Sequence, residues 1–564
     1  MIRVTPDLVK DYTARGWWGS TSLDEDFRAN VARVPARLAM ADPPNRAEFT
    51  QGQPRRLSYA EFDAEVDRLA AVMAGHGVGA GDVVAYQLPN IYEAVAILLA
   101  CSRIGAVASP ILIQFDQHEL DDIFEQLHPR LFVSLTRFKD RAMADNAAPV
   151  CRAKNVPLLN IDQIDGSAPL PGTIEPTGPN DLLTVCWTSG TEGAAKGVMR
   201  THNQWRVIGQ MMHDGAGLCD GDVLRNARPM VNMAAIGGTF YSWLLCAGTM
   251  ILHNPLDLAL VLDQIRQERV TVTFMPPAFM VSLLKDPALG ARADLSSLRV
   301  LGSGSAAIPQ WAIDEMKDRF GVEIINFFGS NEGVSLLSNA VEIPDSSMRS
   351  QYFPRFGRPD ILWASLPGAA WCETRLVDAA TGEEITEPGV TGELRFKGPS
   401  LFAGYLGPDE RTAEAFDEHG FYRTGDLFQI AGDGAVHRFY RFEGRSKEVI
   451  IRGGFNIAPA EIDNMLSAYP AIAEVAAFGY PDDRLGEKLG VAVVPKPGQS
   501  VSLDELVAYL REEHLAVFKL PQALLVMDSL PRNAMLKVLR WKLTELYVAQ
   551  HADSRLQTAE HAHG

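Results

Sequence analysis

The stretch WTSGTEGAAKGVMRTH, residues 187–202, has the composition of a phosphate-binding loop. Its glycines let backbone N–H groups converge on phosphate oxygens, while Thr188, Ser189 and Thr191 add hydroxyl donors and Lys196 adds a positive charge. A Walker loop places its lysine directly after a glycine, whereas two alanines separate Gly193 from Lys196. The stretch therefore predicts phosphate chemistry outside the P-loop NTPases, with a glycine-rich surface turn as the alternative.

Two blocks of the sequence, residues 82–135 and 249–329, alternate apolar β-branched runs with amphipathic runs. Such alternation with short connections predicts an α/β fold of parallel, doubly wound sheets covered by helices. Ligands bind to these sheets at the carboxyl ends of the strands. The glycine-rich strand ends LGSGSAA (301–307) and FFGSNEG (327–333) are therefore candidate parts of one site.

The composition disfavours several classes of protein. The chain has 52 Lys and Arg against 70 Asp and Glu, so its net charge is 52 − 70 = −18, and no nucleic-acid partner is expected. Its six cysteines form no CxxC pair, which disfavours a zinc site or a disulfide framework. We find no signal core and no clean transmembrane run, so the expected location is the cytoplasm.

Further motifs follow the glycine-rich loop in a fixed order: SGSAAIP (303–309), FFGSNEG, GELRFKGPSLFAGY (392–405), YRTGDL (422–427), GRSKEVIIRGGFNIAPAEID (444–463) and PRNAMLKVLR (531–540). Together with TSGTEGAAKG (188–197), they resemble the adenylate-forming, AMP-binding superfamily in its acyl-CoA synthetase branch. The resemblance covers nearly the whole chain. It implies an N-terminal AMP-binding domain over 1–444 with a β-rich subdomain at about 370–444, a hinge at 445–447 that includes Lys447, and a small mobile α+β domain over 448–564.

The resemblance also implies a reaction. A carboxylic acid would be joined to ATP as an acyl-adenylate with loss of pyrophosphate, and then transferred to coenzyme A with release of AMP. The expected ligands are ATP, Mg2+, coenzyme A and a small acid, and the candidate assembly is a homodimer. Joining two anions requires neutralised charge and in-line alignment.

The family's roles carry over to matching positions. Lys537, Glu332 and Thr191 take the catalytic positions, and Glu332 also takes that of the Mg2+ ligand, a single carboxylate beside phosphate oxygens. For Lys537 the alternative is a solvated helix face, and for Glu332 a glutamate favoured at a helix N-terminus. The full set of implied nucleotide and coenzyme A contacts is Thr188, Ser189, Gly190, Thr191, Gly193, Lys196, Ser305, Ala306, Ala307, Phe327, Phe328, Gly329, Asn331, Glu332, Asp426, Arg445, Gly453, Gly454 and Lys537.

The implied acid pocket has small and apolar walls. Its candidate residues are Asn232, Met233, Gly237, Phe240, Ser303 and Gly304. Apart from Arg228, no lysine or arginine in this stretch is placed to meet a second carboxylate. The sequence therefore predicts a medium-sized hydrophobic fatty, alicyclic or aryl acid.

Two alternatives remain open. The enzyme could pass its acyl group to a carrier protein instead of coenzyme A. It could also be a degenerate nucleotide-binding homologue, because Leu536, Asn331 and Asn232 stand where the family usually has Gly, Thr and His.

Overall fold

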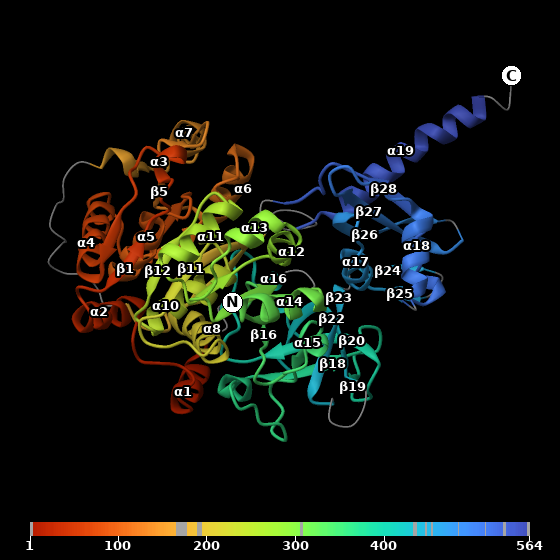
Figure 1. Ribbon diagram of the computed structural model, residues 1–564. Coiled ribbons are helices and arrows are strands. Elements are labelled where there is room, and N and C mark those ends of the chain that lie inside the picture. Colours follow the sequence, from red (N-terminus) through yellow and green to blue (C-terminus); the bar gives the residue numbers. More distant parts are fainter. Residues whose placement is uncertain are drawn as a thin grey trace.

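The computed structural model describes residues 4–164, 177–188, 195–304, 308–431, 437–445, 448–452, 455–482, 484–513, 515–533 and 537–560. Two large sheets, a smaller antiparallel sheet and a separate C-terminal sheet organise the chain (Figure 1). This arrangement confirms the predicted α/β architecture of a large N-terminal part and a small C-terminal domain.

The first large sheet is parallel except at its two edges, where β16 and β2 run antiparallel. Its strands, in spatial order, are β16 (Ser335–Ser338), β15 (Glu323–Gly329), β14 (Val300–Gly304), β13 (Val272–Phe274), β11 (Val223–Asn226), β12 (Thr249–Leu252), β1 (Leu38–Ala41) and β2 (Arg56–Ser58). Helices α11 (Leu258–Gln267), α12 (Pro277–Lys285) and α14 (Gln310–Phe320) pack on its outer face through one apolar cluster.

The second large sheet ends in the strands that flank the glycine-rich loop. Its order is β21 (Gly404–Tyr405), β10 (Lys196–Thr201), β9 (Leu182–Thr188), β4 (Val107–Pro110), β3 (Val83–Tyr86), β5 (Leu131–Ser134) and β8 (Leu158–Asn160). Strand β9 runs parallel to β4, whereas β10 returns antiparallel to β9, with Lys196 opposite Thr188. The loop therefore connects two paired strand ends.

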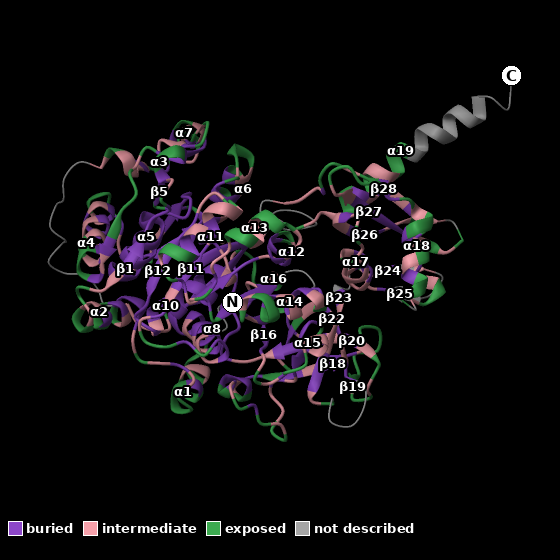
Figure 2. Cartoon of the chain, viewed as in Figure 1, coloured by how far each residue is buried: buried purple, intermediate pink, exposed green. Residues whose placement is uncertain are grey.

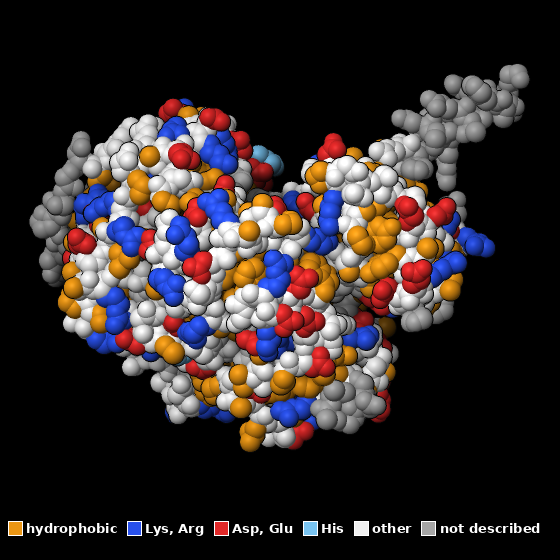
Figure 3. Space-filling view, in the orientation of Figure 1, with side chains coloured by type: hydrophobic (Ala, Val, Ile, Leu, Met, Phe, Trp, Pro, Cys, Tyr) orange, Lys and Arg blue, Asp and Glu red, His pale blue; other side chains and the backbone are white. Residues whose placement is uncertain are grey.

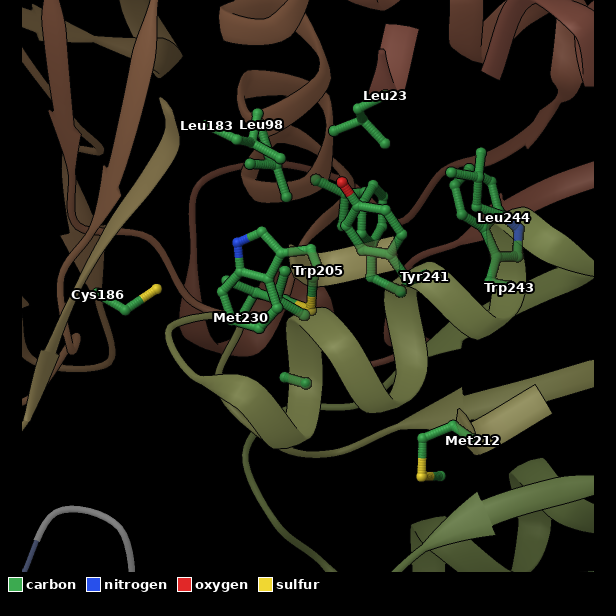
Figure 4. Close-up of a cluster of buried hydrophobic side chains, with 14 of the residues drawn as sticks. Leu23, Leu98, Leu183, Cys186, Trp205, Met212, Met230, Tyr241, Trp243 and Leu244 are labelled. Atoms are coloured by element: carbon green, nitrogen blue, oxygen red, sulfur yellow. The ribbon is translucent and has the colours of Figure 1, made fainter. Parts of the chain in front are cut away.

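The main hydrophobic core lies between the two large sheets (Figure 2). Helices α5 (Tyr92–Arg103), α8 (His202–Gly215) and α10 (Tyr241–Leu245) contribute to it, and Figure 4 shows Trp205, Tyr241 and Leu98 pointing toward one another. The Trp205 indole donates to the Thr184 hydroxyl at 2.8 Å, and the Trp243 indole donates to the Ala39 carbonyl at 3.0 Å. These two bonds attach the central helices to one strand of each sheet.

The third sheet is antiparallel and corresponds to the β-rich subdomain that the resemblance implies at about 370–444. Its order is β17 (Tyr352–Pro354), β23 (Phe439–Arg445), β22 (Tyr422–Ile430), β20 (Thr391–Lys397), β18 (Glu373–Val377) and β19 (Glu384–Ile385). Strand β17 (Tyr352–Pro354) belongs to this sheet although it precedes residue 370, the expected start of the β-rich subdomain.

The C-terminal sheet contains β25 (Phe455–Ile457), β24 (Ile450–Arg452), β27 (Gly486–Pro495), β26 (Ile472–Asp482) and β28 (Ala523–Val526), with α17 (Pro459–Ser467), α18 (Leu503–Glu512) and α19 (Arg540–Glu560). The Lys285 ammonium on α12 donates to the backbone carbonyls of Ser467 at 2.7 Å and Ile472 at 3.2 Å. A side chain of the large domain thus holds the end of α17 and the start of β26.

Surface charge is mixed on the face shown in Figure 3, where acidic and basic side chains are interspersed over the large domain. Within the described ranges, no helix has both the length and the apolar character needed to cross a membrane.

Buried histidines should make the fold sensitive to acid. Burial lowers the pKa values of His202 and His253 to about 3, and the His202 Nδ1 accepts the Leu23 N–H at 3.0 Å. The unfolded chain binds a proton at each histidine between pH 6.5 and 3 whereas the folded chain does not, so stability falls as the pH drops through that window. We expect His202 alone to account for a loss of about 2 kcal/mol between pH 7 and pH 5.

Urea unfolding of the wild type and of His202→Asn at both pH values measures this effect. The Asn side-chain oxygen can still accept the Leu23 N–H, so the variant should lose about 2 kcal/mol less than the wild type. Equal losses would show that His202 is protonated in the folded chain.

Candidate active site

Glu332 lies where the first and second large sheets meet. It follows β15, is 9% exposed, and its Oε1 accepts the Tyr405 hydroxyl at 2.8 Å. The Lys196 ammonium lies 5.2 Å from the centroid of the same Tyr405 ring. Tyr405 therefore connects the predicted metal-binding carboxylate with the lysine that closes the glycine-rich loop.

Arg200 joins the backbone before Glu332 to the segment that carries Tyr405. Its guanidinium donates to the carbonyls of Asn331 at 2.9 Å and Ser400 at 2.7 Å, and it lies 4.1 Å from the Trp205 ring centroid. Burial lowers the Arg200 pKa to about 10, and the nearby Glu332 charge opposes that shift. Arg200 therefore keeps a positive charge near Glu332 at neutral pH while it positions the loop.

The Asn331 side chain points toward the predicted acid pocket. Its Oδ1 accepts the backbone N–H of Met233 at 2.8 Å, at the start of the short helix α9 (Met233–Ala235). The adjacent Glu332 carbonyl accepts the Phe402 N–H at 2.8 Å. Residues 331 and 332 thus join the acid-pocket helix to the segment that carries Tyr405.

Asp426 belongs to the same neighbourhood. It is 4% exposed on β22, where its Cα pairs in register with Arg445. Burial raises the pKa of Tyr422 well above its usual value, and the charges of Glu332 and Asp426 both add to the shift. Both carboxylates therefore lie close enough to Tyr422 to disfavour its ionised form.

Phe328 anchors the β-rich sheet to this region. Its ring contacts Phe428 edge-on at a centroid distance of 5.1 Å, and it also lies against Phe353 and Phe442. The ring is half-buried, so one part supports β22 while another part remains accessible. Its packing places Asp426 opposite the end of β15.

Several predicted residues lie outside the described part of the chain. They are Ser189, Gly190, Thr191, Gly193, Ser305, Ala306, Ala307, Lys447, Gly453, Gly454 and Leu536. The structure describes the backbone of Arg445 but not its side chain. Their roles remain predictions, although Thr188 and Gly304 place two of these segments at strand ends of the two large sheets.

Lys537 lies on a turn of the C-terminal domain. Its side chain is exposed, its backbone N–H donates to Asn533 Oδ1 at 3.0 Å, and the Asn533 N–H donates to its carbonyl at 2.9 Å. A bridge between Arg532 and Val538 closes the base of this turn. The backbone of Lys537 is therefore fixed to Asn533, a short distance before helix α19.

Two residues predicted to line the acid pocket are packed into the core, and their place in the pocket stays a prediction. A Cβ at Gly237 would lie 2.5 Å from Ile208 Cγ2, so this glycine lets its helix pack on α8 rather than leaving room for a ligand. Phe240 is fully buried and packs against Tyr241 and Trp243. Glycine and phenylalanine in an apolar helix serve packing as readily as ligand binding, and the sequence does not distinguish the two.

The remaining predicted pocket residues lie on the strand-end side. Asn232 caps α9 by accepting the Ala235 N–H at 3.2 Å, and the methyl group of Met233 fills the space beside Gly329. The Ser303 hydroxyl donates to the Met275 carbonyl at 2.8 Å, and Gly304 permits close approach of the Phe327 backbone. Ser303 and Gly304 thus hold the end of β14 against β13 and β15.

The roles of Arg200, Tyr405 and Tyr422 were not predicted from the sequence. Tyr405 and Tyr422 stand in the motif stretches GELRFKGPSLFAGY and YRTGDL, and Arg200 follows Lys196 by four residues. Their motif positions were the only signal, because contacts between distant strands are not visible in a sequence.

Known proteins share this arrangement. The family model "AMP-binding enzyme" matches residues 27–406, and "AMP-binding enzyme C-terminal domain" matches residues 461–537. A medium-chain fatty-acid–CoA ligase of Escherichia coli K12 is 30% identical over 94% of this chain and 91% of its own. A feruloyl-CoA synthase of an Amycolatopsis species is 32% identical over 90% of this chain and 96% of its own.

A solved structure extends the likeness to the fold. The ATP-bound structure of MatB from Rhodopseudomonas palustris superposes with a TM-score of 0.78 at 27% identity, covering 93% of this chain and 99% of that chain. The family models match both parts of the chain and the relatives span most of its length, so the chain belongs to the AMP-binding enzyme family of adenylate-forming ligases.

Proposed function

We propose that this protein is an acid:CoA ligase that forms AMP. One observation carries the proposal: the Glu332 carboxylate accepts the Tyr405 hydroxyl at 2.8 Å, and the ammonium of Lys196 in the glycine-rich loop lies 5.2 Å from the centroid of the same ring. A nucleotide bound there would have its phosphates near Lys196 and Glu332 and its ribose near Asp426. The relatives described above, which are CoA ligases by name, support coenzyme A as the acceptor.

The chemistry needs a charge balance that these residues supply. Glu332 would hold Mg2+ through one carboxylate, with phosphate oxygens and water completing the shell, and the bound ion would neutralise phosphate charge. Lys196 adds a second positive charge from the protein, and Lys537 a third when the C-terminal domain closes. The acid carboxylate then attacks the α-phosphate in line and pyrophosphate leaves.

In the second step, thioester formation, coenzyme A must reach the acyl-adenylate in the same site. We propose that the C-terminal domain turns about the 445–447 hinge, withdrawing Lys537 and bringing Gly453 and Gly454 to the adenylate. The coenzyme A thiol then attacks the acyl carbon, and AMP leaves. The acid is proposed to have a medium-sized apolar body, consistent with the half-buried Met233 and Phe327 at the strand ends.

A panel of fatty, alicyclic and aryl acids incubated with ATP, Mg2+ and coenzyme A tests the proposal by product mass. We expect acyl-CoA and AMP from at least one acid with a six- to ten-carbon body. Acyl-adenylate that accumulates with coenzyme A present would favour transfer to a carrier protein. No acid-dependent product from any member would favour a degenerate homologue and overturn the proposal.

A further inference from the structure

Arg228 is an arginine without a counter-ion beside the predicted acid pocket. Within the described residues, no carboxylate pairs with it and no hydrogen-bond acceptor reaches its guanidinium, which lies 5.7 Å from the centroid of the Phe274 ring. Removal from water lowers its pKa to about 10, with no nearby carboxylate opposing the shift. Proteins rarely enclose a charge without a partner, because the loss of hydration is costly.

Arg228 is nevertheless not sealed from solvent. The residue keeps an intermediate exposure although its charge is strongly desolvated. Its backbone is fixed, since its carbonyl accepts from Asn90 Nδ2 and Asn226 Nδ2, both at 2.9 Å.

An apolar wall runs from Arg228 to the loop of Glu332. The Phe274 ring lies 5.4 Å from the Phe327 ring, and both rings fill the space above Gly302. Phe327 and Gly329 share one face of β15, and the Met233 methyl covers Gly329. The Met233 N–H in turn donates to Asn331, the neighbour of Glu332.

We propose that Arg228 is a specificity-determining residue that binds a second oxygen acceptor, a carboxylate or a carbonyl, at the far end of the substrate acid. The reacting carboxylate lies toward Glu332, the apolar body lies along Phe274, Phe327 and Met233, and the distal oxygen accepts from the guanidinium. This inference rests on the proposed function and narrows its substrate class to apolar acids that carry a terminal or ring oxygen.

Acids matched in length test the inference. Unbranched acids of six, eight and ten carbons are compared as the plain acid, the oxo acid with its carbonyl at the penultimate carbon, and the dicarboxylic acid, using pyrophosphate release. The wild type should favour an acid with the second oxygen over the plain acid of equal length by at least tenfold. The better of the oxo and dicarboxylic acids identifies the neutral or the anionic group as the natural acceptor.

The variant Arg228→Leu should lower kcat/KM for the preferred acid by tenfold to a hundredfold, the range for a hydrogen bond to a charged group. It should change kcat/KM for the plain acid less than threefold, and Arg228→Lys should recover part of the loss. The thermal midpoint of Arg228→Leu should equal or exceed that of the wild type, because this variant removes an uncompensated charge. Arg319→Leu is the matched control, because it removes an exposed arginine that lies 5.2 Å from the centroid of the Phe320 ring. It should leave kcat/KM unchanged for both the preferred and the plain acid.

Two outcomes separate this inference from the proposed function. Plain acids preferred at every length, with Arg228→Leu affecting all acids equally, would overturn the role of Arg228 and leave the ligase intact. If none of the acids, including the aryl and alicyclic ones, supports pyrophosphate release by the wild-type protein, both the role of Arg228 and the proposed function would be overturned.

Discussion

Replacing Lys537 with alanine should lower the rate of acyl-adenylate formation by about a hundredfold to a thousandfold, the usual effect of removing one preorganised positive donor from a transition state. The lysine would bridge the attacking carboxylate and the α-phosphate, two groups that repel each other until a cation lies between them. The backbone bond from Lys537 to Asn533 and the bridge between Arg532 and Val538 fix the backbone that carries this lysine. Acid-dependent exchange of pyrophosphate into ATP measures the step.

The second half-reaction provides the internal comparison. Chemically prepared acyl-adenylate and coenzyme A should give acyl-CoA at a rate within a few fold of the wild type, because the proposed rotation of the C-terminal domain would withdraw Lys537 before that step. Lys542→Ala, which removes an exposed lysine five residues later in the same region, should affect neither step. A Lys537→Ala enzyme that retains normal exchange would show that this lysine is only part of a solvated surface.

Replacing Glu332 with glutamine should lower kcat for adenylation by about a hundredfold and raise the concentration of Mg2+ needed for half-maximal rate. The substitution removes the charge but keeps an oxygen that can accept the Tyr405 hydroxyl, now bound at 2.8 Å. The loop should therefore keep its place while its affinity for the metal falls. Steady-state rates over a range of Mg2+ concentrations measure both effects.

Tyr405→Phe distinguishes the effect of the Glu332 charge from that of the hydrogen bond that positions it. Losing the hydrogen bond that the phenol donates to the Glu332 carboxylate should lower kcat by about tenfold, less than losing the charge itself, and leave the Mg2+ requirement nearly unchanged. If Glu332→Gln and Tyr405→Phe behave alike, or if Glu332→Gln leaves the Mg2+ requirement unaltered, then Glu332 acts through the structure of its loop and not through the metal.

The sequence predicted the architecture well because hydrophobic period and glycine-rich strand ends are local signals. The runs around Leu301 and Phe327 form strands β14 and β15, and the apolar run that begins at Tyr92 forms the buried helix α5, as the alternation of patterns implied. The family motifs then placed Glu332 and Asp426 in one neighbourhood, which no periodicity could have done.

The unconfirmed assignments and the omissions have a different origin. Gly237 and Phe240 were assigned to the acid pocket because small and aromatic residues suit such a wall, yet their partners Ile208 and Trp243 make them core residues. Arg200 went unassigned since its role depends on carbonyls of Asn331 and Ser400, far away in the chain. In each case the role of the residue depends on contacts made in the folded chain, and these contacts are not visible in the sequence.

We propose that the glycine-rich loop, Glu332 and Asp426 form one nucleotide site at which an acid is activated. Exchange of labelled pyrophosphate into ATP by the full-length wild-type chain tests it most directly, with each acid of the panel supplied in turn and coenzyme A omitted. We predict exchange that requires both Mg2+ and one of these acids. Exchange absent with every acid, or equally fast with no acid present, would contradict the claim.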